Sequence, residues 1–392
     1  MNNQGGFFFY LCNLLLNLPF HKIMKEIILK NIDPDLSLIA GKILDGKRIT
    51  PDEALTLYRK AGLSLLAVLA TESKKRHSAD SVFFNRNFHI EPTNVCIYNC
   101  RFCSYHKPEG DPESWELTEN EILDIVKRFD GVPVTEVHIT GGVHPSRDIH
   151  YYGKILAAIK KIRPDISIKA YSAVELDYMI RKSGMTITEG LQLLREYGLD
   201  SIPGGGAEIF DETLRRRICR EKADADTYLA IHEAAHNLGL PSNATMLYGH
   251  AENAMQRIDH MLRLRDLQDR TSGFNAFIPL KFRRENNRMS ELGEVPVTED
   301  MRNYALSRIF LDNIPHLKAY WPAIGRNTAL MSLAFGVDDL DGTIDDTTRI
   351  YSMAGAEDSN PGLSTTELVS MIRSAGYKPV ERDTHYHTVK EW

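Results

Sequence analysis

From residue 86 onward, short β-like runs alternate with amphipathic helical stretches, and this alternation constrains the fold more than any other feature. The β-like runs span residues 87–94, 135–142, 166–173, 199–206, 242–249, 273–280, 316–322 and 334–340. Helical patterns lie between them, among others at residues 118–129, 152–162, 225–239 and 254–268. Regular β–α alternation predicts a parallel sheet. Eight such units within about 250 residues predict an α/β fold of the TIM-like (β/α)8 barrel type, either closed or incompletely closed.

The sequence divides into four stretches: a non-native or disordered extension at 1–23, an N-terminal helical segment at 24–85, the barrel at 86–345 and a C-terminal extension packed on the barrel at 346–392. The first stretch holds an apolar run from Phe7 to Phe20 that is too short to span a bilayer. In the second, Thr50, Pro51 and Glu53 have the spacing of a capping box with proline at the first helical position.

Composition narrows the class of protein. The chain is 43% hydrophobic and 26% charged, as is usual for globular proteins. Its net charge of −6 gives no electrostatic footprint for nucleic acid or an anionic membrane, so we expect neither as a partner. Five cysteines are too few for a secreted disulfide framework, and we expect a cytoplasmic protein in which the isolated Cys12 and Cys219 are structural or incidental.

The other three cysteines, Cys96, Cys100 and Cys103, form a C-x3-C-x2-C motif in the loop after the first barrel strand. Active sites of such barrels lie at the carboxyl ends of the strands, so the motif stands where chemistry is expected. A structural zinc site needs four ligands, and no second CxxC pair exists. A disulfide would leave one thiol over. Three thiolates on a [4Fe–4S] cluster would leave one iron with an open position, and this interpretation fits best.

With Phe102 in the aromatic place, this motif resembles the signature of the radical S-adenosylmethionine (SAM) enzymes. The resemblance implies that the three cysteines bind a [4Fe–4S] cluster and that SAM chelates the fourth iron through its amino and carboxylate groups. An electron from the cluster then cleaves the sulfonium to methionine and a 5′-deoxyadenosyl radical. An electron donor such as flavodoxin or ferredoxin is implied as a partner.

The resemblance also implies a SAM site at the ends of the next strands. Gly141 and Gly142 occupy the place of the family's glycine pair, where the backbone approaches the SAM amino group because no Cβ intervenes. In the run PGGGAEI, Glu208 is expected to accept a hydrogen bond from the ribose or methionyl portion. The full set expected to contact SAM is Phe102, Thr140, Gly141, Gly142, Ser172 and Glu208.

Over roughly residues 50–385 the chain resembles the menaquinone and deazaflavin branch of this superfamily, for example in IEPTNVCIYNCRFCSYHK and DSIPGGGAEIFD. Within the branch, TGGVHP, KAYSAVE and FIPLKFRREN are similar to the aminofutalosine synthases. The family reaction adds the adenosyl radical to 3-[(1-carboxyvinyl)oxy]benzoate, and rearrangement with loss of carbon dioxide gives 6-amino-6-deoxyfutalosine, a menaquinone precursor. SAM is consumed as a co-substrate.

Such a small-molecule substrate, with two carboxylates on an aromatic ring, requires cations and an apolar wall. Lys281, Arg283 and Arg284 follow the sixth strand and supply cations, unless this is a solvated basic loop. The remaining substrate or catalytic candidates are His144, Tyr320, Asp338 and Asp339, and each could instead have a structural role in a loop, the core or a helix cap.

Three alternatives stay open. A dehypoxanthine futalosine cyclase or a component of deazaflavin (FO) synthase would abstract hydrogen rather than add the adenosyl group. These enzymes typically carry a glutamine where this chain has Thr140. A non-catalytic electron-transfer protein would bind its cluster through four protein ligands. A zinc-stabilised binding module would hold zinc.

Overall fold

The structure, a computed structural model, describes residues 29–343, 349–356 and 362–392. The expected extension at residues 1–23 lies outside this part of the chain. Three helices come first: α2 (Pro34–Leu44), α3 (Pro51–Lys60) and α4 (Leu63–Ser78). Helix α3 begins as predicted, because Thr50 Oγ1 accepts the Glu53 N–H at 3.2 Å and the Glu53 carboxylate accepts the Thr50 N–H at 2.9 Å.

The described strands form a TIM-like barrel in which all ladders are parallel, except that the last two strands of the chain pair antiparallel. One group runs β2 (Asn87–Ile90), β3 (Glu136–Ile139) and β4 (Ser167–Ala170), and a second runs β5 (Ser242–Tyr248), β6 (Phe274–Lys281) and β7 (His316–Leu317). The third has the order β10 (Thr388–Glu391), β9 (Lys378–Arg382), β1 (Ser81–Asn85) and β8 (Asp339–Gly342). Isolated bridges join the groups, pairing Lys169 with Ser201, Ile202 with Ser242, and Lys318 with Asp339.

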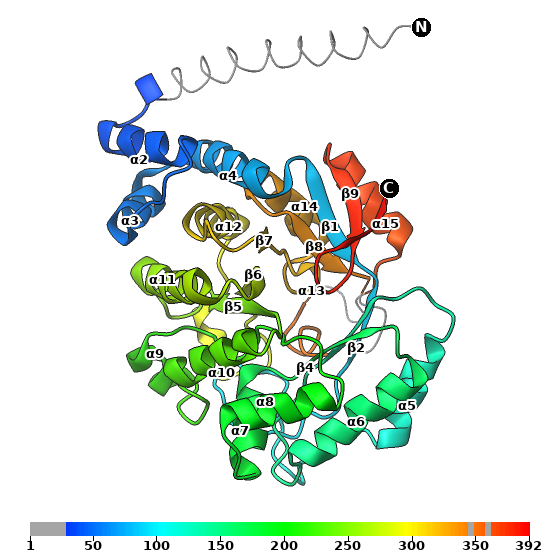
Figure 1. Ribbon diagram of the computed structural model, residues 1–392. Helices are drawn as coiled ribbons and strands as arrows, with labels where there is room; N and C mark the ends of the chain where they lie inside the picture. The colour runs from blue at the N-terminus through cyan, green and yellow to red at the C-terminus, as the bar shows by residue number, and fades with distance from the viewer. Residues whose placement is uncertain (1–28, 344–348, 357–361) are drawn as a thin grey trace, which may run out of the picture.

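The barrel has one open seam, as the alternative of incomplete closure predicted. Strand β1 pairs with β8, and after Arg86 the chain continues directly into β2, which pairs with β3. No ladder joins β8 to β2 within the described ranges, so hydrogen bonds do not close the barrel. Strands β1 and β9, far apart in sequence, lie side by side in parallel (Figure 1).

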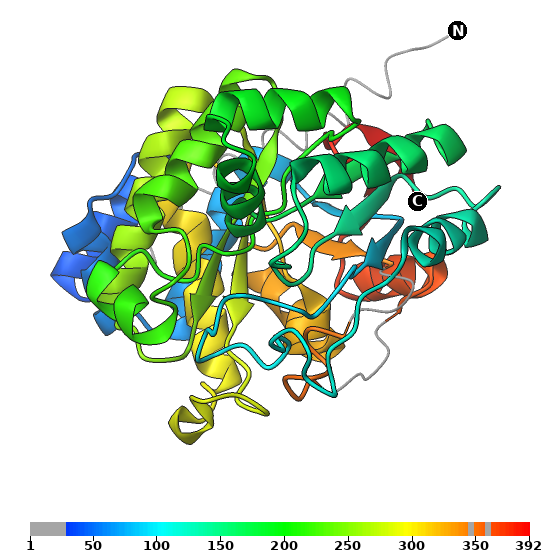
Figure 2. The same ribbon diagram turned by 90° about the horizontal axis from the view of Figure 1, so that it is seen from below.

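Helices surround the strands on the outside (Figures 1 and 2). Those of the βα units are α5 (Glu119–Arg128), α6 (Ile149–Ile162), α7 (Ala173–Lys182), α8 (Ile187–Glu196), α9 (Glu212–Ile218), α10 (Ala225–Asn237), α11 (Ala254–Thr271), α12 (Val297–Phe310), α13 (Trp321–Ile324) and α14 (Arg326–Ser332). Helix α15 (Thr365–Ser374) precedes β9. In the part of the chain that the structure describes, no helix combines the length and apolar character needed to cross a membrane.

Alternation within the strands separates an apolar outside from a polar inside. The buried ring of Phe88 stacks on Phe129, which follows α5, with ring centroids 4.0 Å apart. The neighbouring His89 instead lines a cavity inside the barrel. In register, His89 lies opposite His138 of β3, and His138 lies opposite Lys169 of β4. The barrel interior therefore carries a polar layer beneath the carboxyl ends of the strands.

Several predicted strands were wrong in extent. Only Ser201 and Ile202 bridge within the run 199–206, because Pro203 and three glycines follow. Strand β7 has two residues, since the rest of its run turns into α13, and residues 333–335 form a short 3-10 helix before β8. Strands β1, β9 and β10 were not predicted.

Candidate active site

Backbone hydrogen bonds fix the loop that carries the three cysteines. Cys96 N–H donates to the carbonyl of Lys107 at 2.9 Å, and Ile97 N–H donates to that of Val143 at 3.0 Å. Farther along, Arg101 N–H donates to the carbonyl of Ile218 at 2.8 Å. The loop is thereby held to its own return segment, to the loop after β3 and to the end of α9.

Cys96, Cys100 and Cys103 line one cavity of about 310 Å³ inside the barrel mouth, and all three are free thiols. Burial raises the pKa of each thiol above its ordinary value. Cys219 is buried but does not line this cavity. Among the described side chains, no trio of His, Cys, Asp or Glu surrounds a point as a single ion requires. A cubane spreads its thiolates over separate irons, so three cysteines on one cavity fit it.

The glycine pair after β3 is required by the cysteine loop itself. A Cβ on Gly142 would lie 2.2 Å from the carbonyl oxygen of Val95, and one on Gly141 would lie 2.8 Å from that of Thr93. Gly142 N–H donates to the Thr93 carbonyl at 2.8 Å. Both glycines also line the cavity, so the close approach brings their backbone beside the cysteines.

Thr140 and Ser172 line the same cavity, but their hydroxyls hold a carboxylate of α7. Thr140 Oγ1 donates to Glu175 at 2.9 Å, and Ser172 Oγ does so at 2.7 Å. The same carboxylate accepts the Gly141 N–H at 3.2 Å. Glu175, which sequence reasoning missed, therefore holds Gly141, the first glycine of the pair. Its signal was the capping box that it forms with Ser172 at the start of α7.

Glu208 also lines the cavity, and Lys222 forms a short ion pair with it. Lys222 Nζ lies 5.5 Å from the centre of the Phe102 ring, which lines the cavity beside the cysteines. Burial alone would lower the pKa of Lys222, but Glu208 raises it above the ordinary lysine value. Glu208 has a φ of 51°, an unfavourable conformation for a residue with a Cβ. Sequence reasoning missed Lys222.

Deeper in the cavity, paired charges line the barrel interior. Lys169 Nζ donates to Glu136 at 2.6 Å, and Lys318 Nζ donates to Asp341 at 2.8 Å. Burial would raise the pKa of Glu136, yet Lys169 and neighbouring cations bring it below its ordinary value. Burial lowers the pKa of His138 well below its ordinary value, so its ring is neutral, and its Nε2 has no hydrogen-bond partner among the described residues.

The three predicted cations after β6 have different surroundings. Lys281 lines the cavity, but its Nζ donates to Asp300 of α12 at 2.8 Å. Arg283 lines it too, with one guanidinium nitrogen 2.5 Å from the carbonyl of Gly355 and another 3.3 Å from Glu294. The buried Nε of Arg283 has no hydrogen-bond partner in the described ranges. Arg284 is exposed and does not line the cavity.

Of the remaining candidates, only Tyr320 reaches the cavity, where its ring lies 5.1 Å from that of Tyr351. His144 lies outside it: its Nδ1 accepts the Ser146 N–H at 3.1 Å, and its Nε2 lies 3.7 Å from Glu116.

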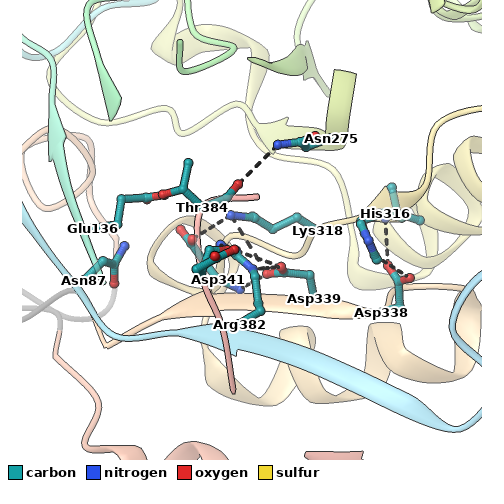
Figure 3. Close-up of polar contacts among 12 residues, drawn as sticks. Asn87, Glu136, Asn275, His316, Lys318, Asp338, Asp339, Asp341, Arg382 and Thr384 are labelled. Atoms are coloured by element: carbon teal, nitrogen blue, oxygen red, sulfur yellow. Dashed lines mark hydrogen bonds and ion pairs between the residues drawn. The ribbon is translucent and has the colours of Figure 1, made fainter. Parts of the chain in front are cut away.

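Asp338 and Asp339 also lie outside the cavity, fully buried in ion pairs. Figure 3 shows Asp338 beside His316, with a 3.1 Å contact to its Nδ1. The same view shows Asp339 beside Arg382, which approaches to 2.8 Å. Both aspartates therefore connect elements of the barrel wall.

The fold and the site define a class: a TIM-like barrel with a three-cysteine loop after β2 and a cavity at the carboxyl ends of the strands. Among solved structures, methylornithine synthase (PylB) has a TM-score of 0.70 at 16% identity, covering 87% of this chain and 97% of that one. The maturase HydG from Carboxydothermus hydrogenoformans has a TM-score of 0.71 at 15% identity, covering 95% and 86%. These likenesses show the fold.

Sequence comparison defines the family. Residues 90–264 match the Radical SAM superfamily, and residues 271–392 match the CofH/MqnC C-terminal region. The chain is 41% identical to aminodeoxyfutalosine synthase of Thermus thermophilus, covering 92% of this chain and 97% of that protein. It is 36% identical to two proteins of Streptomyces coelicolor: aminodeoxyfutalosine synthase, covering 90% and 93%, and cyclic dehypoxanthine futalosine synthase, covering 90% and 88%. The chain belongs to the radical SAM superfamily, in the family that includes the aminodeoxyfutalosine synthases.

Proposed function

We propose that this enzyme adds the 5′-deoxyadenosyl group of SAM to 3-[(1-carboxyvinyl)oxy]benzoate. Rearrangement and loss of carbon dioxide then give 6-amino-6-deoxyfutalosine for menaquinone biosynthesis. One observation carries the proposal: a single cavity runs from the three cysteines to a deep polar layer, and two of the residues that line it, Arg283 and His138, each have a buried nitrogen (Nε and Nε2) without a hydrogen-bond partner among the described residues. Sequence identity to aminodeoxyfutalosine synthases over nearly the whole chain supports it.

In this proposal Cys96, Cys100 and Cys103 would hold the [4Fe–4S] cluster that the family implies, and three thiolates would leave one iron for SAM. When bound, the cluster supplies the electron that cleaves SAM to methionine and the 5′-deoxyadenosyl radical. The backbone of Gly141 and Gly142 would hold the amino group of SAM. Thr140 and Ser172 act through Glu175, which positions Gly141.

The Glu208 carboxylate would accept a hydrogen bond from the SAM ribose or methionyl portion, and Lys222 holds that carboxylate in place. The Phe102 ring lies 5.5 Å from Lys222 Nζ, beside this ion pair. Because a buried ion pair is stable only with good geometry, the pair fixes the carboxylate in a single orientation.

The substrate's two carboxylates are assigned to these two unpartnered nitrogens, with His138 in the tautomer that carries its proton on Nε2. Buried polar atoms are nearly always hydrogen-bonded, so a ligand that satisfies both accounts for them. Arg283 Nε at the cavity mouth would bind one carboxylate, and His138 Nε2 near the interior lysines would donate to the other. Ile278, Leu280 and the Tyr320 ring provide the apolar wall for the benzoate ring. Lys281 is a weaker candidate than its sequence position indicated, because its only polar side-chain atom is already paired with Asp300, whereas Arg283, although paired with Glu294, keeps its Nε without a partner among the described residues.

Product analysis tests the proposal. Cluster-loaded enzyme is given SAM, the enolpyruvyl benzoate and dithionite without oxygen, and the products are identified by mass spectrometry. We expect 6-amino-6-deoxyfutalosine, with the adenosyl carbons of SAM inside the product. Free 5′-deoxyadenosine formed in step with a product lacking those carbons would identify hydrogen abstraction, as in a futalosine cyclase, and would refute addition. We place the enzyme in the cytoplasm, where thiols such as these remain reduced.

A further inference from the structure

The cysteine loop has a second hollow on its outer side, away from the barrel interior. This outer hollow has a volume of about 190 Å³ and is lined by residues 98–101, residues 216–221 and Arg288. Of the three cysteines, only Cys100 lines both this hollow and the interior cavity. Cys100 therefore forms part of the wall between the protein surface and the site where the cluster would sit.

Five exposed arginines ring the outer hollow, and we call them the arginine face: Arg101, Arg216, Arg217, Arg220 and Arg288. Among the described residues, Arg216, Arg217 and Arg220 form no ion pair. Glu221 lines the hollow, and Glu291 lies 4.0 Å from Arg101, so two carboxylates offset only part of the charge. Because the whole chain has a net charge of −6, this concentration of positive charge runs against its average.

Backbone hydrogen bonds hold the arginine face as one surface. Arg101 N–H donates to the carbonyl of Ile218 at 2.8 Å, and Arg288 N–H donates to the carbonyl of Arg101 at 2.8 Å. The Arg288 guanidinium also bonds the carbonyl of Asn99. The cysteine loop, the end of α9 and the loop after β6 are thus tied together around Cys100, and the arginines keep their spacing without a partner present.

We propose that the arginine face is the docking surface for an acidic one-electron carrier protein, whose redox group lies over the outer hollow beside Cys100. The inference rests on the proposed function, which needs an electron at the cysteines to start the cleavage of SAM. Transfer moves one electron and no atoms: the carrier is oxidised by one electron and the centre behind Cys100 is reduced by one. A basic patch on an acidic protein steers an acidic partner to that patch and away from the rest of the surface. Arginine is also enriched in protein interfaces.

The test compares two double charge reversals, with a purified acidic bacterial flavodoxin as the probe. Arg216→Glu with Arg217→Glu alters the arginine face, and Arg128→Glu with Arg373→Glu makes the same change in charge on α5 and α15. These two helices lie across the barrel from α9 (Figure 1). Dissociation constants are measured by isothermal titration calorimetry at low and high salt, with and without the cluster loaded. Turnover of each variant is measured twice, once with reduced flavodoxin and once with dithionite as the electron donor.

We expect the face variant to bind flavodoxin at least tenfold more weakly at low salt and to lose most of the salt dependence. Turnover driven by flavodoxin should fall accordingly, whereas dithionite-driven turnover stays at the wild-type level. The α5/α15 variant should match the wild type both in flavodoxin binding and in flavodoxin-driven turnover. Equal binding by the two variants, or wild-type binding that does not weaken with salt, would overturn the proposal. A failure of dithionite-driven wild-type enzyme to form the adduct would refute the proposed function instead, and the dissociation constants would still decide the docking surface.

Discussion

Arg382 in β9 donates two hydrogen bonds to Asp339 in β8, at 2.9 Å from Nε and 2.8 Å from Nη2, and both side chains are fully buried. Because β1 lies between these strands in the sheet, the guanidinium passes beside β1 to reach its partner (Figure 3). The pair ties the last part of the chain to the barrel wall next to Lys318, whose Nζ lies 3.9 Å from the same aspartate.

Breaking this ion pair should destabilise the folded protein. Arg382→Leu leaves the Asp339 carboxylate buried without its partner, and we expect a loss of about 3–5 kcal/mol in the free energy of unfolding. Chemical denaturation followed by circular dichroism measures it. The exposed Arg373→Leu in α15 is the control and should cost little. Adding Asp339→Leu to Arg382→Leu should recover part of the loss, and a single variant as stable as the control would contradict this account.

Gly142→Ala tests the contact between the glycine pair and the cysteine loop. The added Cβ would meet the Val95 carbonyl oxygen at 2.2 Å, so the loop must move away from β3. We expect iron and sulfide content after anaerobic reconstitution to fall to well under half of the wild-type level. Gly205→Ala is the matched control, because its Cβ would meet only the Ser172 Cβ at 3.6 Å. Normal iron loading in Gly142→Ala would show that the contact is not needed.

Arg283→Gln tests the proposed carboxylate site. Removing a buried charge-assisted hydrogen bond costs about 1.5–3 kcal/mol, which corresponds to a rise of roughly 10-fold to 150-fold in the KM for the enolpyruvyl benzoate. SAM cleavage without substrate should persist, because the cysteines and the glycine pair are unchanged. Arg284→Gln is the control next along the chain and should leave KM unaltered, since Arg284 does not line the cavity. Equal KM values for both variants would remove Arg283 from the site.

Stability should fall in acid because of buried histidines. Burial lowers the pKa of His236 to about 4 and that of His260 to about 3, below the ordinary value of 6.5. Between these pH values the unfolded chain therefore binds protons that the folded chain does not. The contribution of these histidines to the free energy of unfolding is fully present above pH 6.5 and is lost as the pH falls toward 4. His236 alone should account for about 3 kcal/mol of this loss in the free energy of unfolding.

Free energies of unfolding of the apoprotein at several pH values check this prediction. His236→Asn should flatten the slope between pH 6.5 and 4 relative to the wild type, whereas the exposed His150→Asn should not. An unchanged slope in His236→Asn would assign the acid sensitivity to other groups.

Spacing along the chain predicted the parts of the site that one loop or one strand end carries. Cys96, Cys100 and Cys103 share a loop, and the glycine pair ends the next strand, so all of them meet at one cavity. The contributions of Lys222, His138 and Lys169 depend on how loops and strands face one another, which spacing does not give. For His138 and Lys169, which lie in strands, the alternation of polar and apolar residues in β2, β3 and β4 was a usable signal.

Two of the predicted site residues have ion-pair partners that lie far away in the sequence. Lys281 was a candidate to bind a substrate carboxylate, and its Nζ is paired with Asp300 from α12. Asp339 was expected near the substrate, yet Arg382 from the unpredicted strand β9 binds it. Neither partner can be identified until the packing of α12 and the order of the sheet are known.

The central claim is that three cysteines hold a cluster with one iron open to SAM. Mössbauer spectroscopy tests it most directly, on anaerobically prepared protein enriched in the Mössbauer-active isotope of iron, with and without SAM. The account predicts a [4Fe–4S] cluster in which one iron changes its signal when SAM is added. The cluster should be absent from Cys100→Ala and intact in Cys219→Ser, since Cys219 does not line the cavity. A cluster in which no iron changes its signal when SAM is added, or a cluster that is lost in Cys219→Ser, would contradict the claim.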